Sequence, residues 1–338
     1  MTNLTHNLLS WYRKNRRELP WRTKKESICP YYVWISEIML QQTNAKSVID
    51  YYKKFIKKWP TVYSLSKAKL KTILFFWQGL GYYNRANNLL RSSKIICNEF
   101  NGKIPNTYES LIKLPGIGEY TANAILAIAY NKKTIGIDVN INRIVSRIYN
   151  LNTTNNREIN KKIFNLIPNN NSSDFMQALM DIGATICKKK NVNCNICPLK
   201  KNCLFYIEKK RINFESIKKR KKKFLFVFLL KYKNKVLLKK RKKTKLLNGL
   251  MEVPNYLLNN KPSLKKVKKI APFDFDWNIA PGKLNSRISN FDLEVRFLYA
   301  KVNKNFFLNN KTWFDEKDIK KVPISSLMKN ILIHSKPF

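Results

Sequence analysis

Four cysteines lie close together between residues 187 and 203 of this chain. They are Cys187, Cys194, Cys197 and Cys203, with the spacing C-x6-C-x2-C-x5-C. Four thiolates this near to one another along a chain can surround one metal centre. Zinc sites usually pair two C-x2-C knuckles across a longer loop, whereas one x2 pair with unequal flanks favours a cubane held by a single loop. We therefore expect one 4Fe-4S cluster in this segment, with zinc as the alternative.

The chain carries a large excess of positive charge. Its 338 residues include 66 lysines and arginines against 21 aspartates and glutamates, a net charge of +45. A surface this basic repels itself unless salt or a polyanion screens it, so nucleic acid is the expected partner. The chain is also rich in Lys, Asn and Ile, as proteins from AT-rich genomes are, so part of this charge reflects composition.

Nothing in the sequence indicates a membrane or an export signal. No apolar run approaches the ~20 residues that a membrane helix needs, and the first residues lack the apolar core of a signal peptide. Clustered cysteines suit a metal site in a reducing compartment better than a disulfide framework. We expect a monomer without membrane contact, in the cytoplasm and associated with the nucleoid.

Apolar residues recur at helical spacing through the first part of the chain. The expected helices cover residues 4–17, 31–43, 45–59, 67–77, 84–100, 107–113, 140–149, 158–166 and 174–186, with a further apolar helix after residue 118. None of these segments has the alternation of a strand. Residues 1–212 are therefore expected to form a mainly α domain.

The chain changes character after the cysteines. Residues 213–223 are charged and short of apolar residues, which is typical of a linker. Phe224 to Leu230 and Val236 to Leu238 are strand-like runs separated by Lys233-Asn234, a hairpin signal. We expect a basic linker at 213–223 and a second, α+β domain at 224–338.

The stretch from Leu114 to Arg143 reads LPGIGEYTANAILAIAYNKKTIGIDVNINR. Gly116 and Gly118 stand just before the apolar helix, and Asp138 follows about twenty residues later. Glycines let backbone N–H groups approach a phosphate, and a helix N-terminus adds partial positive charge. We interpret the stretch as a clamp for a DNA backbone beside a catalytic acid; a tight turn with a surface or N-cap aspartate is the alternative.

Two further segments contain candidate site residues. The expected helix YYVWISEIMLQQT contains one acid, Glu37, which lies either at the wall of a pocket or at the wet edge of the helix. In GLGYYNRANNL, two glycines beside two tyrosines indicate a sharp turn that projects an aromatic side chain.

Together these motifs resemble the helix-hairpin-helix DNA glycosylase superfamily with an iron–sulfur cluster, and within it the MutY family of adenine glycosylases. WISEIMLQQT, GLGYYNRANNL, LPWR near residue 20 and QALMDIGATIC carry the resemblance, which covers residues 1 to about 210. It implies a glycosylase domain at 1–212, with the helix-hairpin-helix at about 107–130 and an iron–sulfur loop at 187–203.

The residue after Glu119 separates two activities within the superfamily. Endonuclease III-type enzymes have a lysine there, whose amine attacks the sugar and leads to strand cleavage. This chain has Tyr120. The resemblance therefore implies a monofunctional enzyme that removes adenine opposite 8-oxoguanine or guanine. An endonuclease III-type glycosylase and AP lyase for oxidised pyrimidines, and a non-catalytic DNA-binding relative, are the alternatives.

The resemblance also assigns roles to single residues. Glu37 protonates N7 of the adenine and Asp138 stabilises the developing sugar cation, while Tyr120 and Asn140 position this pair. The expected DNA contacts are Gln42, Tyr82, Gly116, Gly118, Gly249 and Ser289.

The second domain is similar to the C-terminal Nudix-like domain of the MutY family. LLNGLMEVPN resembles the WxGLxEFP segment of that domain, with Gly249 in register, and residues 255–270 contain no acid that could hold a divalent metal. The family's FSH loop corresponds to residues 288–290, of which Ser289 keeps a hydroxyl while the Phe and His are not retained. We expect this domain to recognise 8-oxoguanine and not to hydrolyse a pyrophosphate.

Overall fold

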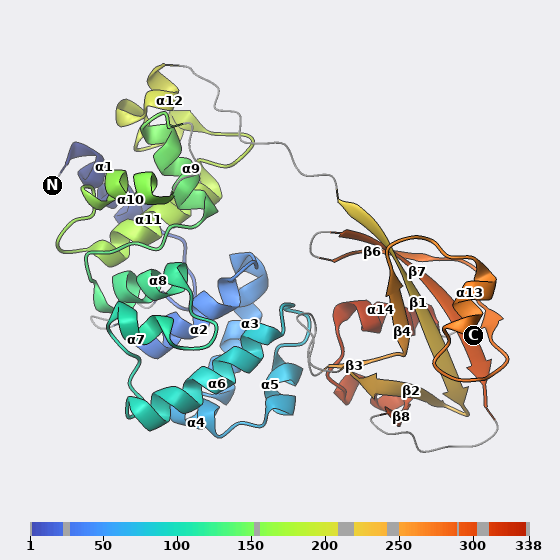
Figure 1. Cartoon of the computed structure of the whole chain (residues 1–338). Coiled ribbons are helices and arrows are strands. Elements are labelled where there is room, and N and C mark those ends of the chain that lie inside the picture. Colours follow the sequence, from blue (N-terminus) through green and yellow to red (C-terminus); the bar gives the residue numbers. More distant parts are fainter. Residues whose placement is uncertain are drawn as a thin grey trace. The chain divides into compact units, whose positions relative to one another are not determined.

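The structure is a computed structural model, and it describes residues 2–22, 28–151, 156–208, 220–241, 250–288, 291–302 and 311–335. It contains two compact units, Met1–Ala68 with Asn88–Ser216 and Lys69–Asn87 with Ile217–Phe338. Figure 1 traces helices through the first two hundred residues and a sheet after them. The domain limits 1–212, 213–223 and 224–338 stay a prediction.

The described chain before residue 220 contains helices and no strand, as expected. Its α-helices are α1 (Asn3–Asn15), α2 (Pro30–Leu40), α3 (Ala45–Lys58), α4 (Val62–Ser66), α5 (Leu70–Phe76), α6 (Asn84–Glu99), α7 (Tyr108–Ile112), α8 (Glu119–Tyr130), α9 (Val139–Ile148), α10 (Asn156–Phe164), α11 (Ser172–Thr185) and α12 (Leu204–Ile207). Thr107 is the N-cap of α7, and its hydroxyl accepts a hydrogen bond from Ser110 N.

The helix expected at residues 67–77 begins later in the structure, at Leu70, the first residue of α5. α4 begins after Thr61, whose hydroxyl accepts from Ser64 N at 3.1 Å while the Ser64 hydroxyl accepts from Thr61 N at 3.2 Å, a reciprocal capping box. α4 ends at Ser66, and Lys69 then precedes α5 as its N-cap. A five-residue helix is too short to produce a periodic apolar pattern, which is why the sequence did not reveal α4.

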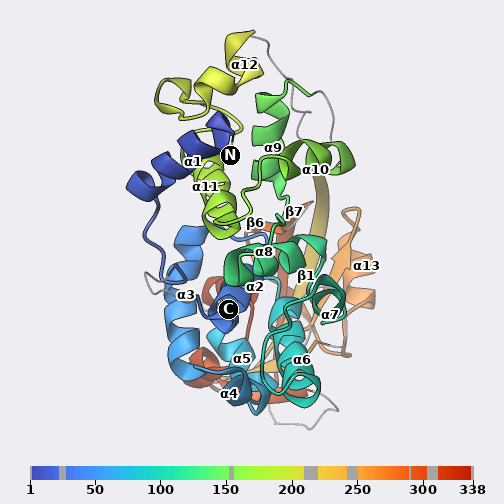
Figure 2. The same ribbon diagram turned by 90° about the vertical axis from the view of Figure 1, so that its left-hand side faces the viewer.

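Helix α2 lies at the centre of the first unit. It packs against α3 and α8, while α11 packs against α1, α8 and α9. Figure 2 shows α2 and α8 together in the middle of the helices and α1, α9 and α11 gathered toward α12. Trp34, Ile35 and Met39 are each at most 1% exposed, so α2 is buried on more than one side. α2 ends at Leu40, earlier than expected, and Gln42 then adopts a left-handed φ of +56°.

The second unit is built on a mixed eight-stranded sheet. β1 (Lys221–Tyr232) runs parallel to β7 (Phe291–Lys301) and antiparallel to β2 (Lys235–Lys240) and β4 (Asn255–Leu258). The expected hairpin at Lys233 is confirmed by the β1–β2 pairing and by the left-handed φ of +49° at that residue. The remaining strands are β3 (Met251–Glu252), β5 (Asn278–Ile279), β6 (Leu284–Ile288) and β8 (Lys311–Asp315).

Both faces of β1 are buried. Leu225, Val227 and Leu229 belong to an apolar cluster that includes residues of α14 (Ser326–His334). Alternating with them, Phe226, Phe228 and Leu230 belong to a second cluster that includes Val267 of α13 (Leu264–Lys269). A strand buried on both faces reads as an unbroken apolar run, which explains the segment FLFVFLL. The expectation of a second, α+β domain is confirmed.

Candidate active site and cysteine loop

Glu37 lies on α2 and is 3% exposed, so it is not at a wet edge of the helix. The pKa of Glu37 is raised to about 7, mainly by burial and also by the charge of Asp138, against a hydrogen bond from Tyr120 and the charge of Arg22, which lower it. Oε2 of Glu37 is buried, and none of the described residues forms a hydrogen bond with it. Such a carboxyl carries a proton in an appreciable fraction of molecules at neutral pH.

Tyr120 stands in the first turn of α8, directly after the LPGIG turn. Its hydroxyl forms a hydrogen bond with Glu37. Burial, followed by the charges of Glu37 and Asp138, raises the pKa of Tyr120 well above its usual range, so the hydroxyl stays a donor. Gly136 makes this arrangement possible, because a Cβ atom there would lie 2.6 Å from the Tyr120 carbonyl oxygen. Sequence reasoning had not identified Gly136.

Asp138 is the N-cap of α9. Its Oδ1 accepts from the backbone N–H groups of Asn140 and Ile141 at 2.9 and 2.8 Å, and its Oδ2 accepts from Asn140 Nδ2 at 2.7 Å. Asp138 can therefore be both the N-cap of α9 and a residue of the candidate site. Val139 is the first residue of the helix and is 80% exposed.

Arg143 connects Asn140 to the beginning of the cysteine loop. Its Nη2 donates to Asn140 Oδ1 and to the Gly183 carbonyl, both at 2.9 Å, and its Nε donates to the Cys187 carbonyl at 2.9 Å. Gly183 is needed here, because a Cβ atom would lie 2.8 Å from Asn140 Cβ. The side chains of Asp138, Asn140 and Arg143 thus form one hydrogen-bonded series.

The cysteine loop is attached to α9 through Arg147 as well. Arg147 Nη1 lies 3.1 Å from Cys187 Sγ and 2.8 Å from the Lys188 carbonyl, and Cys203 Sγ lies 3.4 Å from the Arg147 carbonyl. The guanidinium also stacks on Phe205, with 5.1 Å from Cζ to the ring centroid. The first and last cysteines therefore meet the same residue of α9.

The four thiols are near enough for their charges to act on one another. Burial and the charges of Cys187, Cys203 and Cys194 raise the pKa of Cys197 to about 11, against an opposing hydrogen bond from the backbone at Leu199. In the described part of the chain, no three His, Cys, Asp or Glu side chains are arranged to hold a metal ion.

The LPGIG turn is held from both sides. Gln41 Nε2 donates to the Gly116 carbonyl at 3.2 Å, and the Ser92 hydroxyl donates to the Pro115 carbonyl at 2.8 Å. Gly116 has φ +84°, and a Cβ atom there would lie 2.9 Å from Asn88 Cβ. A Cβ atom at Gly118, the N-cap of α8, would meet nothing within 4 Å. Of the two glycines, Gly116 is therefore the one that the conformation requires.

The loop before α6 presents an aromatic residue. Tyr82 is 40% exposed and has a left-handed φ of +47°, which is unusual for a tyrosine. Arg85 Nη2 donates to the carbonyls of Leu80 and Gly81 at 3.3 and 3.1 Å, and its guanidinium lies 5.4 Å from the ring centroids of both Tyr82 and Trp77. The sharp turn expected around Tyr82 is present.

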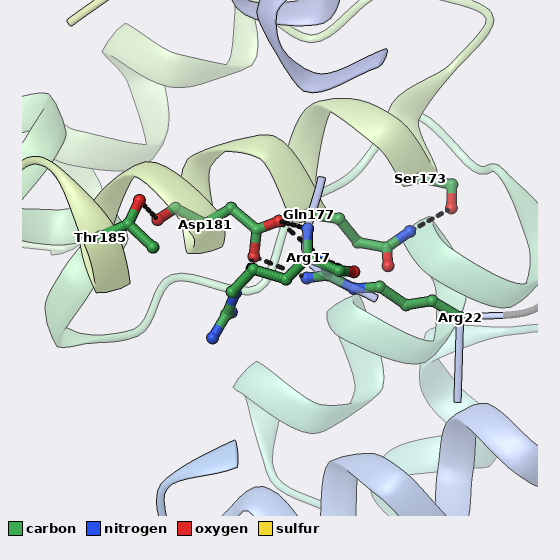
Figure 3. Close-up of polar contacts among 6 residues, drawn as sticks. All are labelled: Arg17, Arg22, Ser173, Gln177, Asp181 and Thr185. Carbon is green, nitrogen blue, oxygen red and sulfur yellow. Dashed lines mark hydrogen bonds and ion pairs between the residues drawn. The ribbon is translucent and has the colours of Figure 1, made fainter. Parts of the chain in front are cut away.

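Asp181 is the most deeply buried carboxylate among the described residues, with 0% exposure. Arg17 Nε lies 2.6 Å from its Oδ1, and Arg22 binds it through two bonds of 2.7 and 3.0 Å. Figure 3 shows both arginines at the Asp181 carboxylate, with Gln177 and Ser173 along the same helix. The sequence did not reveal this group, because Asp181 and its partners are about 160 residues apart and no local pattern links them.

The structure brings Glu37, Tyr120, Asp138 and Asn140 together into one site. Gln42 is exposed at the end of α2, and its neighbour Gln41 makes the contact to the turn. Gly249 and Ser289 lie outside the described residues. Among the described helices, none has both the length and the apolar character needed to cross a membrane.

The helical part of the chain is similar in sequence to known DNA repair proteins. Residues 35–169 match the family described as "HhH-GPD superfamily base excision DNA repair protein", a range that contains Glu37, Tyr120 and Asp138. An adenine DNA glycosylase of Buchnera aphidicola subsp. Baizongia pistaciae is 46% identical over 228 residues, which cover 65% of this chain and 64% of the relative. The human adenine DNA glycosylase is 36% identical over 214 residues, 60% of this chain and 39% of the relative.

Solved structures agree on the fold. A thermostable thymine-DNA glycosylase is similar with a TM-score of 0.56 and 28% identity, covering 60% of this chain and 95% of that one. An endonuclease III–DNA complex shares the fold with a TM-score of 0.53 and 22% identity, over 62% of this chain and 98% of that one. The matched segment spans less than two thirds of the Buchnera relatives. Residues 35–169 thus match the HhH-GPD superfamily of base excision DNA repair proteins, and the helical part of this chain is similar in sequence to adenine DNA glycosylases.

Proposed function

We propose that this protein is a monofunctional adenine DNA glycosylase that hydrolyses the N-glycosidic bond of adenine mispaired with 8-oxoguanine or guanine. The observation that carries the proposal is Glu37, a buried carboxyl whose pKa is raised to about 7, mainly by burial, and whose Oε2 forms no hydrogen bond with the described residues. A general acid works best when its pKa lies near the working pH. The sequence relationship to adenine DNA glycosylases supports the choice of adenine.

The proposed chemistry divides between two carboxyl groups. The protonated Glu37 gives its proton to N7 of the adenine, so that the base leaves as a neutral molecule. Asp138, whose Oδ1 accepts from two backbone N–H groups, stabilises the positive charge that develops on the sugar. Once the base has left, the Glu37 carboxylate accepts a proton from the attacking water. Different surroundings for two neighbouring acids are the usual basis for such a division of roles.

Tyr120 and Asn140 orient these two groups. The Tyr120 hydroxyl donates to Glu37, and Asn140 Nδ2 donates to Asp138 Oδ2 at 2.7 Å. A phenol with its proton retained is a poor nucleophile toward the sugar, in contrast to the lysine of bifunctional enzymes. We therefore propose that the products are free adenine and an intact strand with an abasic site.

The adenine must leave the base stack to reach Glu37. We assign Tyr82 as the side chain that enters the duplex beside the opposite base, and Gln42 as the residue that fills space near the vacated position. Support comes from the exposure of Tyr82 and from the loop that carries it, in which Arg85 donates hydrogen bonds to two carbonyl groups.

The LPGIG turn is the proposed phosphate clamp, with the amides of Gly116 and Gly118 as donors. Gly116→Ala should weaken DNA binding about tenfold or more, because a left-handed alanine costs ~1–2 kcal/mol and the new methyl meets Asn88. Gly118→Ala is the matched control and should bind nearly as well as the wild type. Fluorescence anisotropy with an abasic-site duplex measures both, and equal losses in the two variants would contradict the assignment.

The residues present fit an iron–sulfur cluster. Cys187, Cys194, Cys197 and Cys203 would hold one 4Fe-4S cluster, which would supply a structural cross-link for the loop. Arg147 would then donate to a ligand sulfur, since it already lies 3.1 Å from Cys187 Sγ. Lysines of the same loop, Lys188, Lys189 and Lys190 among them, are exposed and would face the DNA backbone.

The sheet domain is proposed to recognise 8-oxoguanine in the opposite strand, with Ser289 and Gly249 as contacts. Its nearest acid to the segment 255–270 is Glu252, which binds Arg241 at 2.6 Å and Lys239 at 3.6 Å and so is engaged in ion pairs. That arrangement supports recognition over metal-dependent hydrolysis. We further infer a monomer that acts on double-stranded DNA in the cytoplasm.

A glycosylase assay tests the proposal. Duplexes containing A opposite 8-oxoguanine, A opposite G, or thymine glycol are incubated with the protein, and half of each reaction receives alkali. We expect strand breaks at the two adenine mispairs only after alkali. Breaks without alkali, or cleavage at thymine glycol, would indicate the endonuclease III-type activity; binding without any base release would indicate a non-catalytic relative.

A further inference from the structure

The loop between α5 and α6 has an unusual backbone conformation. Gly79, Gly81 and Tyr82 have φ values of +101°, +79° and +47°. Glycine adopts positive φ readily, but a residue with a Cβ atom does so only at a cost in energy. The backbone of Tyr82 is therefore strained, and contacts made by its neighbours must keep it in this conformation.

Two buried side chains bind the backbone of this loop. Trp77 Nε1 donates to the Gly81 carbonyl at 3.0 Å. Arg85 Nη2 donates to the same carbonyl at 3.1 Å and to the Leu80 carbonyl at 3.3 Å. The Gly81 carbonyl belongs to the peptide bond that leads into Tyr82, so these two donors fix the chain directly before the strained residue.

The guanidinium of Arg85 also lies over the ring of Tyr82. Its Cζ atom is 5.4 Å from the centroid of that ring and 5.4 Å from the centroid of the Trp77 ring, within the range of a cation–π contact. Burial lowers the pKa of Arg85 to about 10, while the nearby Tyr82 opposes this shift, so the guanidinium is charged at neutral pH. Arg85 is 7% exposed and Tyr82 is 40% exposed. A buried cation thus contacts a ring that is partly open to solvent.

We propose that Arg85 is a positioning residue for Tyr82: by binding both the backbone of the loop and the face of the ring, it fixes the orientation in which the ring stacks on a base of the duplex. The inference rests on the proposed function, because it requires Tyr82 to enter the duplex. A ring that is already ordered loses little conformational freedom on entering the base stack, so more of the stacking energy remains for binding.

A purely structural role of Arg85 makes a different prediction. If Arg85 only stabilises the fold, its loss should weaken DNA binding equally whether the Tyr82 ring is present or absent. If Arg85 acts through Tyr82, its loss should have no further effect once the ring has been removed. A double-mutant cycle separates the two roles.

The first measurement follows the Tyr82 ring in the free protein. The full-length chain is labelled with 3-fluorotyrosine, and the Tyr82 signal is assigned by its loss in Tyr82→Phe. In the wild type we expect a ¹⁹F shift that differs from that of a fully exposed tyrosine, because the ring is ordered beside a charge. Arg85→Met should move the signal to the exposed value. Arg91→Met, which removes an exposed arginine of the same helix, is the matched control and should leave the signal in place.

The second measurement follows the DNA. Two duplexes carry a tetrahydrofuran abasic site opposite guanine, with 2-aminopurine on the 5′ or the 3′ side of that guanine, so that an entering side chain changes its stacking and fluorescence. At saturating protein, the wild type and Arg91→Met should change the fluorescence, Arg85→Met should change it less, and Tyr82→Ala should leave it unchanged. Binding should weaken ~10–100-fold in Tyr82→Ala and about tenfold in Arg85→Met. The double variant should match Tyr82→Ala alone.

Equal losses from Arg85→Met with and without the Tyr82 ring would overturn the proposal, and so would an unchanged ¹⁹F signal in folded Arg85→Met or full fluorescence change with Tyr82→Ala. If Arg85→Met does not fold, Arg85→Lys provides the test: lysine keeps the charge but lacks the planar fork, so both signals should move part of the way, and binding should weaken only when Tyr82 is present. Failure of the wild type to release adenine would overturn the proposed function alone, because neither measurement depends on base release.

Discussion

Glu37 and Asp181 are both buried carboxylates of the helical domain, and their surroundings are opposite. Asp181 accepts from two arginines, whereas Glu37 has a tyrosine hydroxyl as partner and one oxygen to which none of the described residues forms a hydrogen bond. In the sheet domain, Glu252 and Glu294 resemble Asp181, because each binds two basic side chains within 3.6 Å. Of these four carboxylates, three are held in ion pairs, and Glu37, for which no ion pair is found among the described residues, is the one we propose for proton transfer.

The strongest test of the comparison removes the proton donor. Glu37→Gln keeps the shape of the side chain and cannot protonate the base, so adenine release from an A:8-oxoguanine duplex should fall by ~10²–10⁴-fold. Single-turnover kinetics measure the rate, and anisotropy should find binding retained. A rate within a few-fold of the wild type would mean that Glu37 is buried without being the acid.

Substitution of Asp181 should change the stability of the protein. Asp181→Asn leaves two arginines with one neutral partner and should lower the free energy of unfolding by ~3–5 kcal/mol. Urea denaturation followed by circular dichroism measures the change. Asp174→Asn, on the same helix, should cost far less, and a similar loss in both variants would show that the ion pairs are not responsible.

Glu37→Gln should have the opposite effect on stability. The pKa of Glu37 is about 7 in the folded protein and lies above its unfolded value, so the folded state holds the extra proton between about pH 4.5 and 7 and loses stability as pH rises through that range. At pH 8 the glutamine should therefore stabilise the protein, by at most ~3 kcal/mol. Thermal unfolding at pH 5 and pH 8 tests this, and an equal melting difference at both pH values would refute the raised pKa.

The smallest effect is expected in the sheet domain. Glu252→Gln keeps one acceptor for Arg241 and loses the charge, at a cost of ~1 kcal/mol, because both basic partners are partly exposed. Base release from an A:G duplex should be unchanged. A loss of release comparable to that of Glu37→Gln would place a chemical role where we find only ion pairs.

The sequence revealed those site residues that belong to short, dense motifs. Glu37, Tyr120 and Asp138 were found because each stands in a recognisable run of neighbours, and the structure brings them together. Asp181, Arg17 and Arg22 escaped because an ion pair across some 160 residues leaves no periodic mark on either segment.

The sequence also did not reveal the two positions where close packing requires a glycine. Gly136 and Gly183 stand beside no turn signal, and only the tertiary contacts with Tyr120 and Asn140 show why a side chain is excluded. The contact between Gln41 and the LPGIG turn was also not expected from the sequence. Side-chain direction at the end of a helix depends on the left-handed residue that follows it, which the apolar pattern does not encode.

The parallel pairing of β1 with β7 affects how the chain folds during its synthesis. Lys221 pairs with Phe291 and Lys231 with Lys301. During synthesis, β1, which has apolar side chains on both faces, therefore cannot pair with β7 until about seventy more residues have been made. At the ribosome, β1 emerges with that surface uncovered, a state prone to aggregation. The lysines that begin β1 then act as gatekeepers, since their like charges keep newly made chains apart until β7 arrives.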